Sequence, residues 1–203
     1  MATPTYISVT EGAGKKLAAD TYQENGQVVL DQKVLIGEQY LPTYSIAPNS
    51  TTGIASDVAN SHIFEIMAGA SLNVRIRSFR IIATTMPAAA TGVIFQVLRL
   101  STAGTGGSAL TPAPYDTADT AGATAMTLPS AKGTETTFLF AYEIGFPAAL
   151  PVNNSYEWAW TPPINGKPII IPAGTTHGIC LKNLGAPVGS RVTFYVEIVE
   201  TSF

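Results

Sequence analysis

The segment near the C-terminus alternates strictly between apolar and polar side chains, and this alternation constrains the fold more than any other feature of the sequence. Its apolar members are Val192, Phe194, Val196 and Ile198. The residues between them are Arg191, Thr193, Tyr195 and Glu197. Because successive side chains of a strand point to opposite faces of a sheet, the pattern predicts a strand with one face in a core and the other toward solvent. The chain is therefore expected to be built from sheets.

Other segments predict further strands, and no long amphipathic helical pattern occurs among them. The alternation of residues 27–37 predicts one long strand, and the nearly continuous apolar run of residues 93–100 predicts a strand that is covered on both faces. Within residues 72–86 the apolar positions change phase, as a β-bulge or a bend at a sheet corner would cause. Frequent glycine and proline at short spacing favour a sandwich or a barrel.

Two irregular segments indicate how the chain is organised. Residues 41–55 are rich in Pro, Ser, Thr and Gly, which predicts a connector behind an N-terminal arm. We therefore expect an arm with one long strand and a connector at residues 1–58, and a sandwich at residues 59–203. Residues 101–134 form the longest irregular piece, and a loop of this length in a compact domain is usually functional or disordered. Only residues 125–128 indicate a short strand within it.

The low charge of the chain indicates the kind of partner that it has. Charged residues make up 12% of the 203 residues, half of the ~25% that is usual for soluble domains. An exterior of uncharged side chains suits a molecule that its neighbours cover. The net charge of -3 argues against nucleic acid as a partner. The N-terminus lacks the pattern of a secretion signal, and no apolar run approaches the ~20 residues that cross a bilayer, so we expect synthesis in the cytosol and no membrane partner.

Candidate catalytic and metal-binding residues are few. His177 and Cys180 are close in sequence, but residues three apart in a strand point to opposite faces, so the favoured interpretation is a small buried Cys and a His at a turn. His62 could supply a base instead, but nothing in the sequence brings it near Cys180. Asp116 and Asp119 lack the spacing of a calcium loop, which favours solvated carboxylates. We predict no catalytic residue, no metal site and no cofactor.

An aromatic stripe leaves two alternatives open. Tyr156, Trp158 and Trp160 share one face of a predicted strand. Facing solvent, these rings could stack on sugar rings. Facing inward, they would fill the core between two sheets, which is the more common role of such a stripe.

The last third of the sequence resembles a family of virion proteins. It contains the run Ile169-Ile170-Ile171-Pro172-Ala173-Gly174, then His177-Gly178-Ile179-Cys180-Leu181, then the amphipathic terminal strand. This arrangement resembles the C-terminal half of jelly-roll virion proteins of tailed bacteriophages. The Gly12-Ala13-Gly14 arm with its long strand, and the loop rich in Ala, Thr and Gly, resemble head-decoration and auxiliary capsid proteins of such phages.

The resemblance implies an all-β fold, a two-sheet antiparallel jelly-roll sandwich with an extended N-terminal arm that pairs with neighbours. It implies no cofactor and no enzymatic activity. The expected function is that of a structural virion component, made in the host cytoplasm, that self-associates as a dimer or trimer and decorates or cements a capsid of other virion proteins. The expected interface residues are Tyr6, Val28, Leu30, Val34, Ile36 and Tyr115. The alternative is a receptor- or carbohydrate-binding module of a phage tail or fibre, which would use Tyr156, Trp158 and Trp160.

Overall fold

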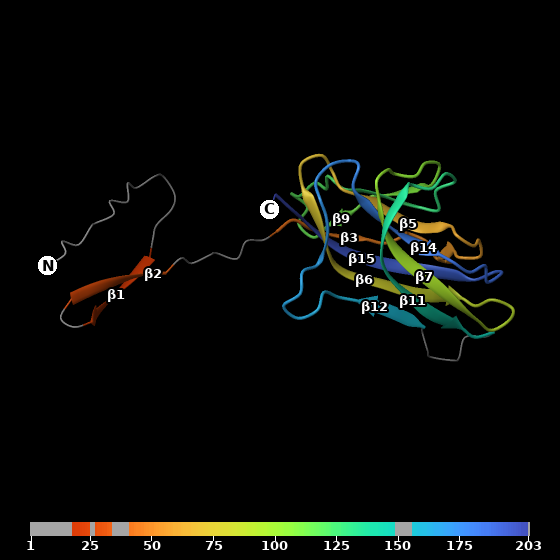
Figure 1. Ribbon diagram of the computed structural model, residues 1–203, viewed down its shortest axis with the longest axis horizontal. Coiled ribbons are helices and arrows are strands. Elements are labelled where there is room, and N and C mark those ends of the chain that lie inside the picture. The colour runs from red at the N-terminus through yellow and green to blue at the C-terminus, as the bar shows by residue number, and fades with distance from the viewer. Residues whose placement is uncertain (1–17, 25–26, 34–40, 149–155, 203) are drawn as a thin grey trace. The chain divides into compact units, whose positions relative to one another are not determined.

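The computed structural model describes residues 18–24, 27–33, 41–148 and 156–202 (Figure 1). The chain divides into two compact units, Met1–Tyr40 and Leu41–Phe203. The described residues form strands, turns and irregular segments without any helix, which confirms the all-β prediction. None of them therefore belongs to a helix that could cross a membrane.

The first unit contains a β-hairpin. Strand β1 (Ala18–Glu24) pairs antiparallel with β2 (Gln27–Lys33), in a register that runs from Ala18 opposite Lys33 to Glu24 opposite Gln27. The predicted long strand is thus present over its first seven residues, and residues 34–37 lie outside the described ranges. Its partner β1 was not predicted, because the segment Ala-Ala-Asp-Thr-Tyr-Gln-Glu has no clear apolar alternation.

The second unit consists of two antiparallel sheets (Figure 1). The six-stranded sheet has the order β11 (Glu135–Phe146), β7 (Thr91–Leu100), β14 (Gly178–Asn183), β5 (His62–Met67), β10 (Thr124–Thr127) and β8 (Ser108–Leu110). The seven-stranded sheet has the order β12 (Glu157–Trp160), β6 (Asn73–Thr85), β15 (Arg191–Thr201), β3 (Thr43–Ile46) and β9 (Ala113–Pro114). In that sheet β13 (Ile169–Ile171) also pairs with β6, and β4 (Ile54–Ala55) pairs with β15.

The core lies between the two sheets, and the terminal strand contributes to it as predicted. The apolar side chains of β15 from Val192 to Ile198 are fully buried, while the alternate residues are partly exposed. Phe194 packs on Phe64 of the other sheet with ring centroids 4.7 Å apart. Strand β15 also pairs with β6 and β3, so it holds its own sheet together as well.

The predicted change of phase in β6 is a β-bulge. Val74 and Ile76 point into the core before the bulge, and Phe79 and Ile81 do so after it. The register with β15 shifts between Ile76 and Ser78, which leaves Arg77 as the extra residue. The phase change therefore keeps apolar side chains on the core face along a strand of 13 residues.

The expected connector belongs to the sandwich. Strand β3 lies within residues 41–55 and pairs with β15, where Ile46 is opposite Val196, and Tyr44 and Ile46 are fully buried. The structural boundary falls between residues 40 and 41, whereas the sequence pattern predicts it between residues 58 and 59. A four-residue strand between Pro42 and the pair Ala47-Pro48 gives too short an alternation to stand out from the composition around it.

Residues 101–134, which we call the strap, connect β7 to β11 and add strands to both sheets. Strand β10 extends the six-stranded sheet beyond β5, and β9 extends the other sheet beyond β3. The predicted short strand at residues 125–128 is present as β10. Only two residues separate β8 from β9, so the strap passes from one sheet to the other along one side of the sandwich.

Candidate functional site

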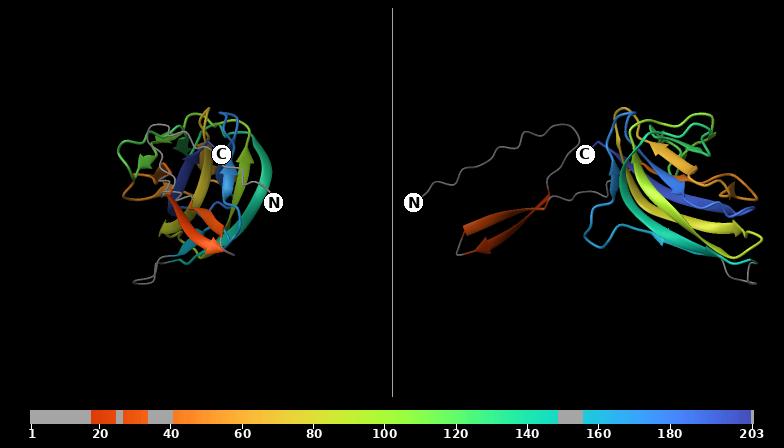
Figure 2. Two further views of the ribbon diagram at one scale, coloured as in Figure 1. Left: turned by 90° about the vertical axis from the view of Figure 1, so that its left-hand side faces the viewer. Right: turned by 45° about the vertical axis from the view of Figure 1, so that its right-hand side comes forward.

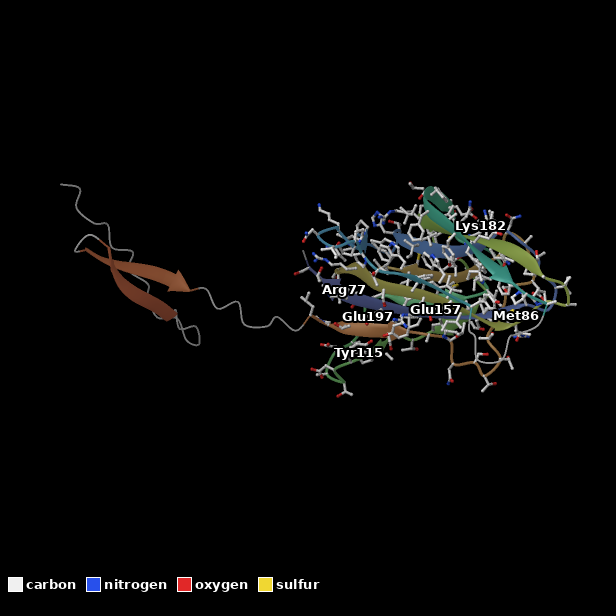
Figure 3. All side chains as sticks on the ribbon, turned by 90° about the horizontal axis from the view of Figure 1, so that it is seen from below. Arg77, Met86, Tyr115, Glu157, Lys182 and Glu197 are labelled. Atoms are coloured by element: carbon white, nitrogen blue, oxygen red, sulfur yellow. The ribbon has the colours of Figure 1, made fainter. Side chains whose placement is uncertain are left out.

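A group of buried and partly buried polar side chains lies under the strap, on the face of the six-stranded sheet that is turned away from the core. Its members are His62 and Glu65 of β5, Glu135 of β11, and Cys180 and Lys182 of β14. We call these five residues the polar cluster. In Figure 3, Lys182 lies at the upper side of the sandwich, and Tyr115 and Glu197 lie at the lower side.

A bulge in β5 assembles the polar cluster. In a regular strand, residues three apart such as His62 and Glu65 point to opposite faces. The register between β5 and β14 shifts between Phe64 and His62, so Ile63 and Phe64 both pack in the core. His62 and Glu65 consequently share the outer face, where the Nδ1 of His62 lies 2.6 Å from the Oε1 of Glu65.

Glu65 anchors both ends of the strap. Its carboxylate accepts hydrogen bonds from the backbone N–H of Gly104 (2.7 Å) and of Gly133 (3.0 Å), and its side chain is 1% exposed. A Cβ at Gly104 would lie 2.8 Å from Glu65 Oε1, so only glycine allows this close approach. Burial by itself would raise the pKa of Glu65, but the hydrogen bonds from His62, Gly133 and Gly104 outweigh burial and lower it.

Glu200 of β15 anchors the middle of the strap in the same way. Its carboxylate accepts hydrogen bonds from the backbone N–H of Gly122 (2.9 Å) and of Ala123 (2.6 Å), and its side chain is 1% exposed. Gly69 packs against Gly122, since a Cβ at Gly69 would lie 2.6 Å from the Gly122 carbonyl oxygen. Buried backbone amides need acceptors, and these two carboxylates supply them where sheet pairing does not.

Glu135 joins the polar cluster to two lysines. Its carboxylate lies 3.0 Å from the Nε2 of His62 and accepts a hydrogen bond from the Nζ of Lys182 at 2.9 Å. The Nζ of Lys132 in the strap lies 3.5 Å from the same carboxylate. Burial raises the pKa of Glu135, but the hydrogen bonds and positive charges of Lys182 and His62 outweigh it and lower the pKa to about 2.

Cys180, His62 and Glu65 have the order of a thiol–imidazole–carboxylate triad. The Sγ of Cys180 lies 3.5 Å from the Nε2 of His62, whose Nδ1 contacts Glu65. Such an arrangement activates a nucleophile only when the thiol reaches substrate as a thiolate. Here the thiol is 1% exposed, and burial together with the charges of Glu135 and Glu65 raises its pKa. The geometry therefore supports packing and anchoring rather than nucleophilic attack.

The contact between His62 and Cys180 has no signal in the sequence, because the bulge and the pairing of β5 with β14 create it. His177 lies at a turn, with its Nδ1 3.2 Å from the carbonyl oxygen of Ala173. Asp116 accepts a hydrogen bond from the N–H of Ala118 at 3.0 Å, as in an Asx-turn. Within the described ranges, His, Cys, Asp and Glu form no group of three or more that could hold a metal ion.

The aromatic stripe lies between the edge strands of the two sheets. Trp158 of β12 stacks on Tyr142 of β11 with centroids 3.5 Å apart and planes 2° apart, and Trp160 stacks on Phe140 at 6.0 Å. Tyr156 and both tryptophans are partly buried and pack against the core. These contacts use ring faces that a sugar ring would otherwise need.

Of the expected interface residues, Tyr115 is the one whose side chain is described. It is 59% exposed, and its hydroxyl contacts the hydroxyl of Tyr195 and the Oε2 of Glu197 (Figure 3). Val28 and Leu30 lie in β2, where they pair with Gln23 and Thr21 of β1. Tyr6, Val34 and Ile36 fall outside the described residues.

Comparison with known proteins gives no relative: no family model, no curated protein and no solved structure matches the chain. Its function is therefore inferred from its own geometry and composition.

We expect Glu65→Gln to lower the free energy of unfolding by about 3 kcal/mol, because the amide removes the charge and keeps only one acceptor oxygen, so that one of the two buried N–H donors faces an NH2 group. Urea denaturation followed by tryptophan fluorescence measures the change. Glu143→Gln is the matched control, since Glu143 is an exposed carboxylate of the same sheet and its loss should cost less than ~0.5 kcal/mol. Equal losses in the two variants would show that Glu65 does not anchor the strap.

The lowered pKa values predict how stability depends on pH. A carboxylate whose pKa is lower in the folded state stabilises the fold above its unfolded pKa and loses this contribution as the pH falls through its folded pKa. Stability should therefore be level from pH 7 to about 5 and should decrease between the usual value of 4.5 and about 2, the pKa of Glu135. Urea midpoints across this range measure it, and Glu135→Gln should reduce the decrease. A midpoint that stays constant down to pH 2.5 would contradict the polar cluster as described.

Cys180 is the single cysteine, so its reactivity reports directly on the site. We expect the native thiol to react with a disulfide reagent roughly 100-fold more slowly than free cysteine, and at the free rate in urea, since burial keeps it protonated and covered. The control is a Cys180→Ser, Ser108→Cys double variant, which carries one thiol at an exposed strap position. A native Cys180 that reacts faster than free cysteine would restore the nucleophile hypothesis.

Proposed function

We propose that this chain is a structural component of a virion, without enzymatic activity, that self-associates and decorates or cements a capsid. The strand order of the sandwich is the observation that carries this proposal. The low charge of the chain and the hairpin in its first forty residues give further support.

The strand order supports a jelly-roll topology. Apart from β4 and the strap, the chain order is β3, β5, β6, β7, β11, β12 with β13, β14 and β15. One sheet then has the order β3-β15-β6-β12 and the other β5-β14-β7-β11, so the earliest strands lie beside the latest. Two nested Greek keys produce this order, and viral capsid domains commonly use it. Fold alone does not define function, so the composition and the surface of the chain must also fit the proposed structural role.

The exposed side chains of the sandwich are of the kind that neighbouring proteins could cover. Large apolar side chains that are more than half exposed include Val58, Ile164 and Val188. With 12% charged residues, the exterior imposes little desolvation cost at contacts. The net charge of -3 does not favour nucleic acid, so we propose protein partners, namely copies of the chain and other virion proteins.

The hairpin supports an attachment role for residues 1–40. An isolated two-stranded hairpin is only marginally stable in water, and its outer strand edges are ready to pair with another strand. We therefore propose that this segment is an N-terminal arm that completes its sheet with a strand of a neighbouring protein. The alternative, a receptor- or carbohydrate-binding module, receives less support, because Trp158 and Trp160 stack on Tyr142 and Phe140.

Deleting residues 1–40 tests the proposal. We expect the shortened chain to remain folded, because the core lies within residues 41–203, and to lose its attachment to the assembled particle or its native oligomeric mass. Val29→Pro, which removes one N–H from β2, should have the same effect with a smaller change to the chain. Native mass and copy number per particle are the measurements. Raising the salt to 1 M should not release the full chain, since screening weakens only charged contacts. Unchanged mass and attachment after deletion would refute the role of the arm.

A further inference from the structure

Strand β11 is a long strand at the edge of a sheet. It has 12 residues and, among the described residues, pairs only with β7 (Figure 2). The other sheet edges end in β8, β9 and β12, which have three, two and four residues. Short edge strands protect a sheet from further pairing, whereas a long one presents a row of backbone N–H and C=O groups to another strand.

The second half of β11 is regular enough to accept such a strand. Its pairing with β7 runs without interruption from Phe140 opposite Val97 to Phe146 opposite Thr91, and both register shifts lie before it. The side chains of Ala141 and Glu143 are exposed, while Ile144 and Phe146 are buried. Aromatic and β-branched residues dominate the strand, which favours extended backbone.

Exposed apolar side chains accompany this edge. Phe138 of β11 is 53% exposed, and Ile94 of the neighbouring β7, opposite Glu143, is 43% exposed. Apolar side chains beside an unpaired strand edge are typical of a surface that another protein covers. The edge thus offers both backbone pairing and apolar burial.

We propose that β11 pairs antiparallel with β11 of a second copy across a two-fold axis and joins the two six-stranded sheets into one. This inference rests on the proposed self-association and identifies the edge of β11 as the surface through which it occurs. A two-fold contact needs one patch that complements itself, and two identical strand edges meet antiparallel by symmetry. Glu143 is the single charged residue between Phe140 and Phe146, so a register with the two-fold axis at Tyr142, which sets Glu143 opposite Ala141 of the second copy, avoids like charges.

Sedimentation velocity of the full chain, from about 1 to 100 µM, tests the inference across the usual range of transient affinities. Ala141→Glu adds a carboxylate near Glu143 of the facing strand, and we expect it to weaken dimerisation at least tenfold. Ala141→Gln has a similar size without charge and should retain the wild-type dimer. Ser108→Glu places the same charge at the opposite edge of the sheet, in exposed β8, and should also have no effect.

Hydrogen exchange provides a second readout. In the dimer, backbone amides within residues 140–146 should exchange more slowly as the protein concentration rises, and in Ala141→Glu they should not. If the wild type self-associates and Ala141→Glu does so equally well, the β11 contact is wrong while the proposed function stands. If the wild type is monomeric throughout and joins no particle, both are wrong.

Discussion

Buried carboxylates bonded to backbone amides of the strap are the interaction on which the sandwich depends. Glu65 receives N–H groups from both ends of the strap and Glu200 receives them from its middle. A carboxylate without such partners would be costly at these depths, and so would the amides without acceptors. These hydrogen bonds hold the strap, which has little regular structure, along one side of the sandwich, where it adds strands to both sheets. Glycine at position 104 makes the close approach to Glu65 possible, since a Cβ there would lie 2.8 Å from Glu65 Oε1.

The position of the strap also determines which edge strands of the two sheets are left without a partner strand. On one side the strap covers β3 and β5 with the short strands β9 and β10. On the other side, stacked rings of β11 and β12 join the sheets. The edge of β11 that faces away from β7 has no strand paired to it among the described residues. A sandwich that is closed on one side and open on the other is suited to directional contacts, which agrees with the proposed role as a building block.

The sequence predicts the features that depend on residues close together in the chain, and it does not predict those that depend on residues far apart. The strand at residues 191–198 and the bulge in β6 were predictable, because local alternation encodes both. The strap was not, apart from β10, since its order comes from Glu65 and Glu200, which are distant in sequence and carry no local signal. The polar cluster was missed for a related reason: a bulge at Ile63 places His62 beside Cys180, and two residues 118 apart meet only through the pairing of β5 with β14. Strand β3 was mistaken for a connector because four residues give too little periodicity.

Native-state hydrogen exchange at the strap tests the central claim most directly, because it measures whether this segment opens separately from the sandwich. If the carboxylates fasten it, the amides of Gly104, Gly122, Ala123 and Gly133 should exchange about as slowly as the core amides of β15 and should require the same global opening. Exchange of these four amides at rates close to those of an open loop, while β15 stays protected, would contradict the account.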